Sequence, residues 1–103
     1  MKNKYIAEFV GTFALSFVVL AAVSQMLPLP VAVPVIAGLT LGLFVYTIGG
    51  VSGAHINPAV TIGLWSISKI NNRDAFGYIV AQIFAAAVAI VLARTLTMAT
   101  PEA

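Results

Sequence analysis

The residues best suited to chemistry lie together near the middle of the chain, in the run Ser52-Gly53-Ala54-His55-Ile56-Asn57-Pro58-Ala59-Val60-Thr61. Asn57 and Pro58 predict a helix start, because asparagine is a preferred N-cap and proline suits the first helical position. The free N–H groups and dipole of such a helix place partial positive charge at its start, which disfavours cations. The Asn57 amide can donate hydrogen bonds, and the carbonyl groups from about Gly53 to Ile56 can accept them. We therefore expect this segment to orient small polar molecules in single file.

Other reactive residue types are few. His55 is the only histidine and the chain has no cysteine, so the ligands of an ordinary metal site are missing. The carboxylates Glu8, Asp74 and Glu102 are too dispersed to indicate an acid/base pair. We expect no enzyme, no catalytic or metal site and no cofactor.

The elements that position this segment must belong to a membrane protein. The chain is 61% hydrophobic and 8% charged, whereas soluble domains are about 25% charged. No charged residue lies between Phe9 and Ser68. Wound as a single helix, this interval would be roughly three times as long as the hydrocarbon core is thick. The net charge of +2 is too small and scattered to indicate nucleic-acid binding. These features predict an all-α membrane protein that folds back on itself.

Three spans and one shorter segment follow from the pattern. We expect spans at about 5–27, 31–50 and 75–97, the first ended by the prolines at 28, 30 and 34, which cannot continue a helix. The first part of residues 51–68 is glycine-rich, and the remaining part is too short to span the bilayer. Irregular backbone survives in a bilayer only where protein buries it or it lines water, so this segment predicts a re-entrant loop and half-helix. The 103 residues would form a single module.

Small residues suggest where helices approach one another. They recur every four residues along the third span, and one pair with the same spacing lies in the second span. Another helix could pack closely at such positions, although small residues are common in membrane helices anyway. The residues are Gly77, Ala81, Ala85, Ala89 and Ala93, with Gly38 and Gly42.

Charge asymmetry predicts the orientation in the membrane. Lys2, Lys4, Lys69 and Arg73 would lie on one side and only Arg94 near the other. By the positive-inside rule the N-terminus and the mouth of the loop are cytoplasmic. The first apolar segment is too long for a signal peptide, so we expect it to be retained.

The segment from Ser52 to Thr61 resembles the first-half signature of the aquaporin and glycerol-facilitator family, Ser-Gly-Ala-His-x-Asn-Pro-Ala-Val-Thr, at every specified position. Residues 7–13, 61–65 and 77–82 are similar to the same family, and most of all to bacterial water channels. The resemblance implies half of an inverted repeat, whose two Asn-Pro-Ala loops meet at the membrane centre. It implies a bacterial or archaeal plasma membrane and a second half as partner.

The resemblance also implies roles for individual residues. Glu8 would support the loop by hydrogen bonds, with interfacial snorkelling as the alternative; Gln82 would bind the loop or another helix, and His55 would brace the loop. Val60 stands where second halves carry the filter arginine, and Ala37 where water-selective members carry a large aromatic residue, so the pore would be glycerol-sized or absent. The expected pore-lining residues are Gly53, Ala54, His55, Ile56, Asn57, Pro58 and Ala59.

Two interpretations of function remain open. The chain could be a channel subunit for water or a small neutral solute such as glycerol, completed by a separate second half or, less readily, by an inverted copy of itself. The charge bias disfavours the inverted copy. Alternatively, it could be a truncated or vestigial fragment that inserts, packs as an oligomer and conducts nothing. The sequence leaves the solute and the oligomeric state open.

Overall fold

The computed structural model describes residues 2–26 and 30–99. Within them the chain forms four helices: α1 (Lys2–Val23), α2 (Val33–Ser52), α3 (Pro58–Ser66) and α4 (Asn72–Ala99). Three of these, α1, α2 and α4, are long and apolar enough to cross a membrane. The nine residues of α3 rise only about 13 Å, less than half of the hydrocarbon core. The predicted all-α membrane fold is confirmed.

The first helix ends earlier than the apolar run suggested. It stops at Val23, and Ser24 to Met26 form a turn in which Gln25 has a positive φ of 65°. The expected end at Leu27 and the following Pro28 lie outside the described residues. A local left-handed turn therefore ends α1 before the first proline is reached.

The other helix boundaries follow local capping. Pro34 lies in the first turn of α2, and α2 runs to Ser52 because Gly53 adopts the left-handed conformation, with φ 87°. Gly53 N–H donates to the carbonyl of Gly49 at 2.9 Å. At the start of α4, Asn71 Oδ1 accepts from the N–H of Asp74 at 2.7 Å, which explains why α4 begins at Asn72, three residues before the expected start.

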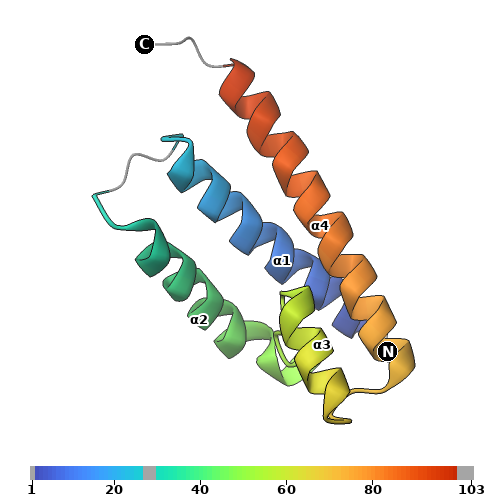
Figure 1. Cartoon of the computed structure of the whole chain (residues 1–103). Coiled ribbons are helices and arrows are strands. Elements are labelled where there is room, and N and C mark those ends of the chain that lie inside the picture. Colours follow the sequence, from blue (N-terminus) through green and yellow to red (C-terminus); the bar gives the residue numbers. More distant parts are fainter. Residues whose placement is uncertain (1, 27–29, 100–103) are drawn as a thin grey trace.

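The central helix of the arrangement is α1, with α2 on one side and α4 on the other (Figure 1). Short α3 packs against α4 near the end where α2 finishes and α4 begins. Of the small residues in α4, Ala85, Ala89 and Ala93 are buried. Gly77 faces α1 closely, since a Cβ atom there would lie 2.6 Å from Cε1 of Tyr5.

The outer face of α2 has no partner among the described residues. No atom lies within 4 Å of a Cβ added at Gly38 or Gly42, and Leu39, Leu43 and Tyr46 are exposed. A close helix contact at this face stays a prediction for a partner outside the described chain.

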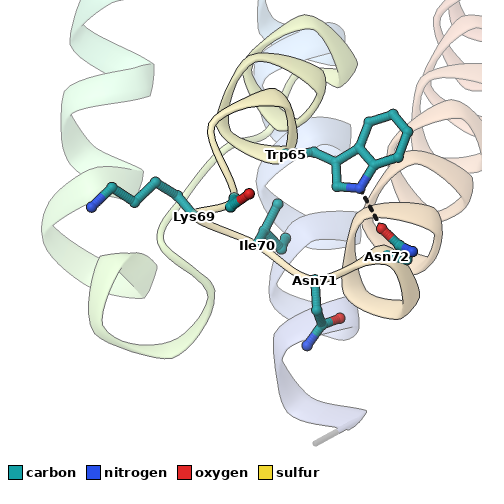
Figure 2. Close-up of a pocket in the computed structure, with 6 residues that line it drawn as sticks. Trp65, Lys69, Ile70, Asn71 and Asn72 are labelled. Carbon is teal, nitrogen blue, oxygen red and sulfur yellow. Dashed lines mark hydrogen bonds between the residues drawn. The ribbon is translucent and has the colours of Figure 1, made fainter.

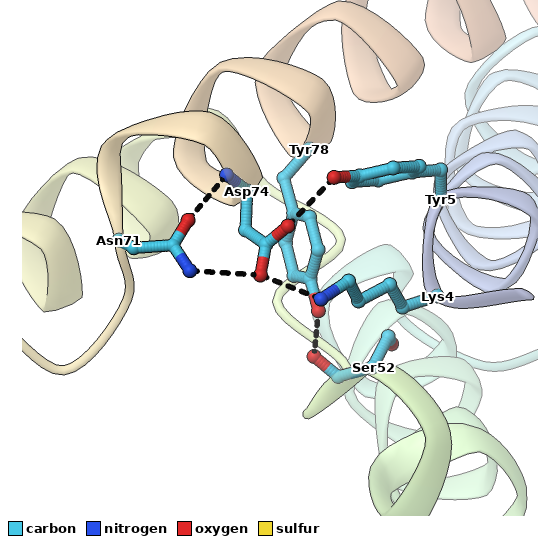
Figure 3. Close-up of polar contacts among 6 residues, drawn as sticks. All are labelled: Lys4, Tyr5, Ser52, Asn71, Asp74 and Tyr78. Atoms are coloured by element: carbon cyan, nitrogen blue, oxygen red, sulfur yellow. Dashed lines mark hydrogen bonds and ion pairs between the residues drawn. The ribbon is translucent and has the colours of Figure 1, made fainter. Parts of the chain in front are cut away.

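Polar contacts join the starts of α1 and α4 (Figure 3). Lys4 Nζ lies 2.6 Å from Asp74 Oδ2, and the Tyr5 hydroxyl donates to Asp74 Oδ1 at 2.6 Å. These contacts fix the two helices at the end of the molecule where α3 also lies.

Candidate functional site

The backbone of residues 53–57, called the 53–57 loop below, connects α2 to α3 in a strained conformation. Ala54 and Ile56 have positive φ values of 51° and 40°, a region that costs energy for residues other than glycine. The side chains of Ala54, His55 and Ile56 are buried. Contacts from the helices must therefore hold this loop in place.

The main hold comes from Glu8 of α1, whose side chain is 0% exposed. Its Oε2 atom accepts from the N–H of His55 at 3.0 Å, and its Oε1 atom accepts from the N–H of Ile56 at 2.7 Å. Gln82 of α4 donates to Oε1 at 2.9 Å, and the Ser52 hydroxyl donates to Oε2 at 2.7 Å. A fully buried carboxylate does not reach the interface, so the geometry favours loop support over snorkelling.

Thr61, in the first turn of α3, extends this network. Its Oγ1 lies 2.9 Å from His55 Nδ1 and accepts from Gln82 Nε2 at 3.0 Å. Thr61 is 0% exposed. It belongs to the sequence motif, but nothing in its residue type or position separates it from its neighbours there.

The N–H groups of the 53–57 loop are directed inward. Ala54 N–H donates to Ser52 Oγ at 3.1 Å, and the next two N–H groups donate to Glu8. In a trans peptide the preceding carbonyl points the opposite way. The carbonyls of Ala54 and His55 therefore point away from Glu8, and that of Gly53 points away from Ser52 Oγ. None of the three accepts a hydrogen bond from the described residues.

Asn57 is the N-cap of α3. Its Oδ1 accepts from the N–H of Ala59 at 2.8 Å, and its carbonyl accepts from the N–H of Thr61 at 3.2 Å. The Asn57 side chain is exposed, and within the described part of the chain its Nδ2 group has no acceptor. Pro58 and Ala59 follow Asn57 directly in the chain; Ala59 is exposed and Pro58 half-buried.

The two filter-equivalent positions lie on different helices. Ala37 is half-buried on α2, and Val60 is exposed near the start of α3. Both are small or medium apolar side chains, and neither adds a charge near Asn57. Their role stays a prediction.

A hollow of about 540 Å³ lies beside Asn57 and is bordered by Thr12, Ile56, Pro58 and Gln82. Thr12 Oγ1 and Gln82 Oε1 are buried, and neither has a hydrogen-bond partner among the described residues. The hollow is therefore mainly apolar, and these two unpaired oxygen atoms lie buried behind its wall.

A more polar hollow, of about 440 Å³, lies at the opposite end of α3. Trp65 Nε1 donates to Asn72 Oδ1 at 2.6 Å across it, and Lys69 extends away from Trp65 (Figure 2). Its lining residues run from the end of α3, through the connection, to the first residue of α4, away from the Asn57 cap.

Sequence reasoning missed two residues that contact the 53–57 loop. Ser52 ends α2 and binds Glu8 through its side chain. The side chain of Tyr78 is 4% exposed, and its hydroxyl donates to the carbonyl of Ser52 at 2.6 Å. The only sequence signal for Tyr78 was its place within the segment 77–82.

Comparison with known proteins matches residues 1–103 to the family described as Major intrinsic protein. Aquaporin AqpM of Methanothermobacter thermautotrophicus is 39% identical over 86% of this chain and 45% of its own length. The Glycerol uptake facilitator protein-like 6 of Lactiplantibacillus plantarum is 44% identical over 84% of this chain and 40% of its own. Aquaporin Z of Photorhabdus laumondii is 42% identical over 90% of this chain and 45% of its own. The chain thus spans less than half the length of these relatives, which are channels and facilitators, not enzymes.

Proposed function

Because this chain belongs to the major intrinsic protein family, we propose that it supplies one half of a membrane pore for water or a small neutral solute such as glycerol. The observation that carries the proposal is the polarity of the 53–57 loop. Three of its N–H groups, those of residues 54–56, donate to Ser52 and Glu8, while three carbonyls and the Asn57 side-chain amide remain available.

This arrangement suits neutral molecules that both donate and accept hydrogen bonds. The start of α3 carries partial positive charge, which disfavours cations, and the Asn57 amide donates to a passing oxygen. The carbonyls of Gly53, Ala54 and His55 accept from its hydrogens. A water or hydroxyl group could move along this path while exchanging one hydrogen bond for another.

The depth of the Asn57 cap supports a second half on the opposite side. At about 1.5 Å per residue, α3 reaches only part of the way across the bilayer, so the path beyond Asn57 needs another wall. Families built as inverted repeats supply it with a second loop at the midplane. The mainly apolar hollow beside Asn57 is the surface we assign to that half.

The second half could come from further residues of the same polypeptide or from another chain. An inverted copy is less favourable, since Lys4, Lys69 and Arg73 gather at the end of the molecule that we place in the cytoplasm, and only Arg94 lies toward the other. We further propose a plasma-membrane location with a cytoplasmic N-terminus. Small side chains at Ala37 and Val60 favour a path wide enough for glycerol.

The test is osmotic shrinkage of vesicles, followed by light scattering, with the chain alone and joined to the second half of the Photorhabdus laumondii Aquaporin Z. Asn57→Asp replaces the amide donor by a negative charge and should abolish the protein-dependent shrinkage. Asn3→Asp makes the same chemical change at an exposed position of α1 and should leave it intact. Joined protein that inserts correctly yet shrinks no faster than empty vesicles would refute the proposal and favour a non-conducting fragment.

A further inference from the structure

We propose that Tyr78 is a positioning residue that fixes the start of the 53–57 loop and thereby directs the loop carbonyls toward the path. This inference rests on the pore proposed above. Tyr78 lies in the second turn of α4 and lines no part of the proposed path. It contacts the loop from behind, where its side chain is 4% exposed.

The first contact is with the end of α2. The last carbonyls of a helix have no partner within the helix, and an unpaired carbonyl inside a bilayer is costly. Tyr78 donates its hydroxyl to the carbonyl of Ser52, the last residue of α2, at 2.6 Å (Figure 3). The Ser52 side chain is bound at the same time by Glu8. Ser52 is therefore held by α4 through its backbone and by α1 through its side chain.

The second contact is with the loop itself. The rings of Tyr78 and His55 meet edge to face, with centroids 4.8 Å apart. Tyr78 thus touches the chain on both sides of Gly53 and Ala54, whose carbonyls are among those directed into the path. Ala54 has a positive φ of 51°, and such strained backbone persists only where surrounding contacts over-determine it. Loss of the hydrogen bond between Tyr78 and Ser52 should therefore let the backbone around Gly53 and Ala54 relax.

Tyr78 is itself fixed by the start of α1. Its ring meets that of Tyr5 edge to face, with centroids 6.0 Å apart. The Tyr5 hydroxyl is bound by Asp74, which also pairs with Lys4 (Figure 3). The absence of a side chain at Gly77 permits this approach, because a Cβ there would lie 2.6 Å from the Tyr5 ring. A continuous set of contacts therefore runs from the helix ends to the loop.

The decisive experiment compares Tyr78→Phe with Tyr46→Phe. Each substitution removes one hydroxyl, but Tyr46 is 93% exposed on α2 and serves as the matched control. Amide hydrogen exchange is measured on the 103-residue chain in lipid nanodiscs. For Tyr78→Phe we expect exchange at Ala54, His55 and Ile56 to rise about fivefold, the factor carried by one neutral hydrogen bond, with the centre of α4 unchanged. Tyr46→Phe should change none of these rates.

Equal exchange in the two variants would overturn the proposal, and so would a rise spread evenly over α1, α2 and α4, which would indicate general packing. Should Tyr78→Phe fail to insert, the Cζ resonances of Tyr78 and Tyr46 in the unaltered chain report the same bond. Indistinguishable hydroxyl signatures at the two residues would overturn the proposal as well.

Flux through the joined protein gives the functional consequence. Tyr78→Phe should lower the water permeability per inserted channel and raise its activation energy, whereas Tyr46→Phe should do neither; equal values in the two variants would refute the positioning role. If the unaltered joined protein conducts nothing, the proposed pore fails, but the exchange comparison still decides whether Tyr78 holds the loop. The two failures are therefore distinguishable.

Discussion

Replacing Gly11 by alanine would test how closely the 53–57 loop is held against α1. A Cβ atom at Gly11 would lie 2.5 Å from Cγ2 of Ile56 and 3.1 Å from Cδ1 of Ile48. Carbon atoms approach favourably only to about 3.5 Å, so Ile56 would have to move by roughly 1 Å. Because Ile56 binds Glu8 through its N–H and directly precedes Asn57, this movement would reach the cap of α3.

The expected size of the effect combines two opposing terms. Overpacking costs about 1–3 kcal/mol, while replacing a helical glycine by alanine gains about 1 kcal/mol. The free energy of unfolding should therefore fall by about 0–2 kcal/mol for Gly11→Ala. Gly42→Ala shows the helix gain alone, because no atom lies within 4 Å of a Cβ at Gly42, and it should stabilise the chain by about 0.5–1 kcal/mol.

Unfolding of the 103-residue chain by denaturant in micelles, followed by circular dichroism, measures both terms. Adding Ile56→Ala removes the Cγ2 atom, so Gly11→Ala should then show mainly the helix gain of about 1 kcal/mol, which gives a coupling of about 1–3 kcal/mol between residues 11 and 56. The reasoning is refuted if Gly11→Ala stabilises as much as Gly42→Ala. It is equally refuted if the cost of Gly11→Ala is unchanged when Ile56 is alanine.

Two further substitutions address the polar contacts. Glu8→Gln replaces one carboxylate oxygen by an NH2 group, which then faces the N–H of either His55 or Ile56. The free energy of unfolding in micelles should therefore fall by about 2–4 kcal/mol. A loss no larger than that of Asn3→Asp would contradict the network. Asp74→Asn weakens the contact with Lys4 at the helix ends, so it should lower the Tm slightly. The decrease should be largest at low ionic strength, because salt screens ion pairs near the surface. A Tm difference that is independent of salt would argue against this ion pair.

The helices could be predicted because the bilayer restricts what an apolar chain can do. The long uncharged interval and the short run after Asn57 leave few alternatives to three spans and a half-helix. The helix ends were harder, because they depend on single local conformations. α1 ends at Val23, before the left-handed Gln25, and α4 starts early because Asn71 caps it; the apolar pattern shows neither boundary.

The sequence was less informative about which side chains face one another. Trp65 and Tyr78 are both aromatic residues within family-like segments, but Trp65 is 47% exposed whereas Tyr78 is buried. The spanning helices are apolar on all sides, and a helix of that kind has no polar stripe to show its buried face. Ser52 and Tyr78 meet across 26 positions of sequence, so only the folded arrangement of α2 and α4 brings them together. Glu8 and Gln82 were identified through the family resemblance and not through spacing.

In the 53–57 loop the N–H donors have hydrogen-bond partners and the carbonyl acceptors do not, which argues for water on the carbonyl side of the loop. All three N–H groups from Ala54 to Ile56 have partners from Ser52 and Glu8, whereas the carbonyls that point the other way have none among the described residues. Lipid cannot satisfy such carbonyls, and unpaired polar backbone in a bilayer is tolerated only against protein or a water-filled cavity. If a second half packed directly on the carbonyls, it would need a matching row of donors. A narrow file of water would satisfy them without such a row and would leave Asn57 free to donate, as the pore proposed above requires.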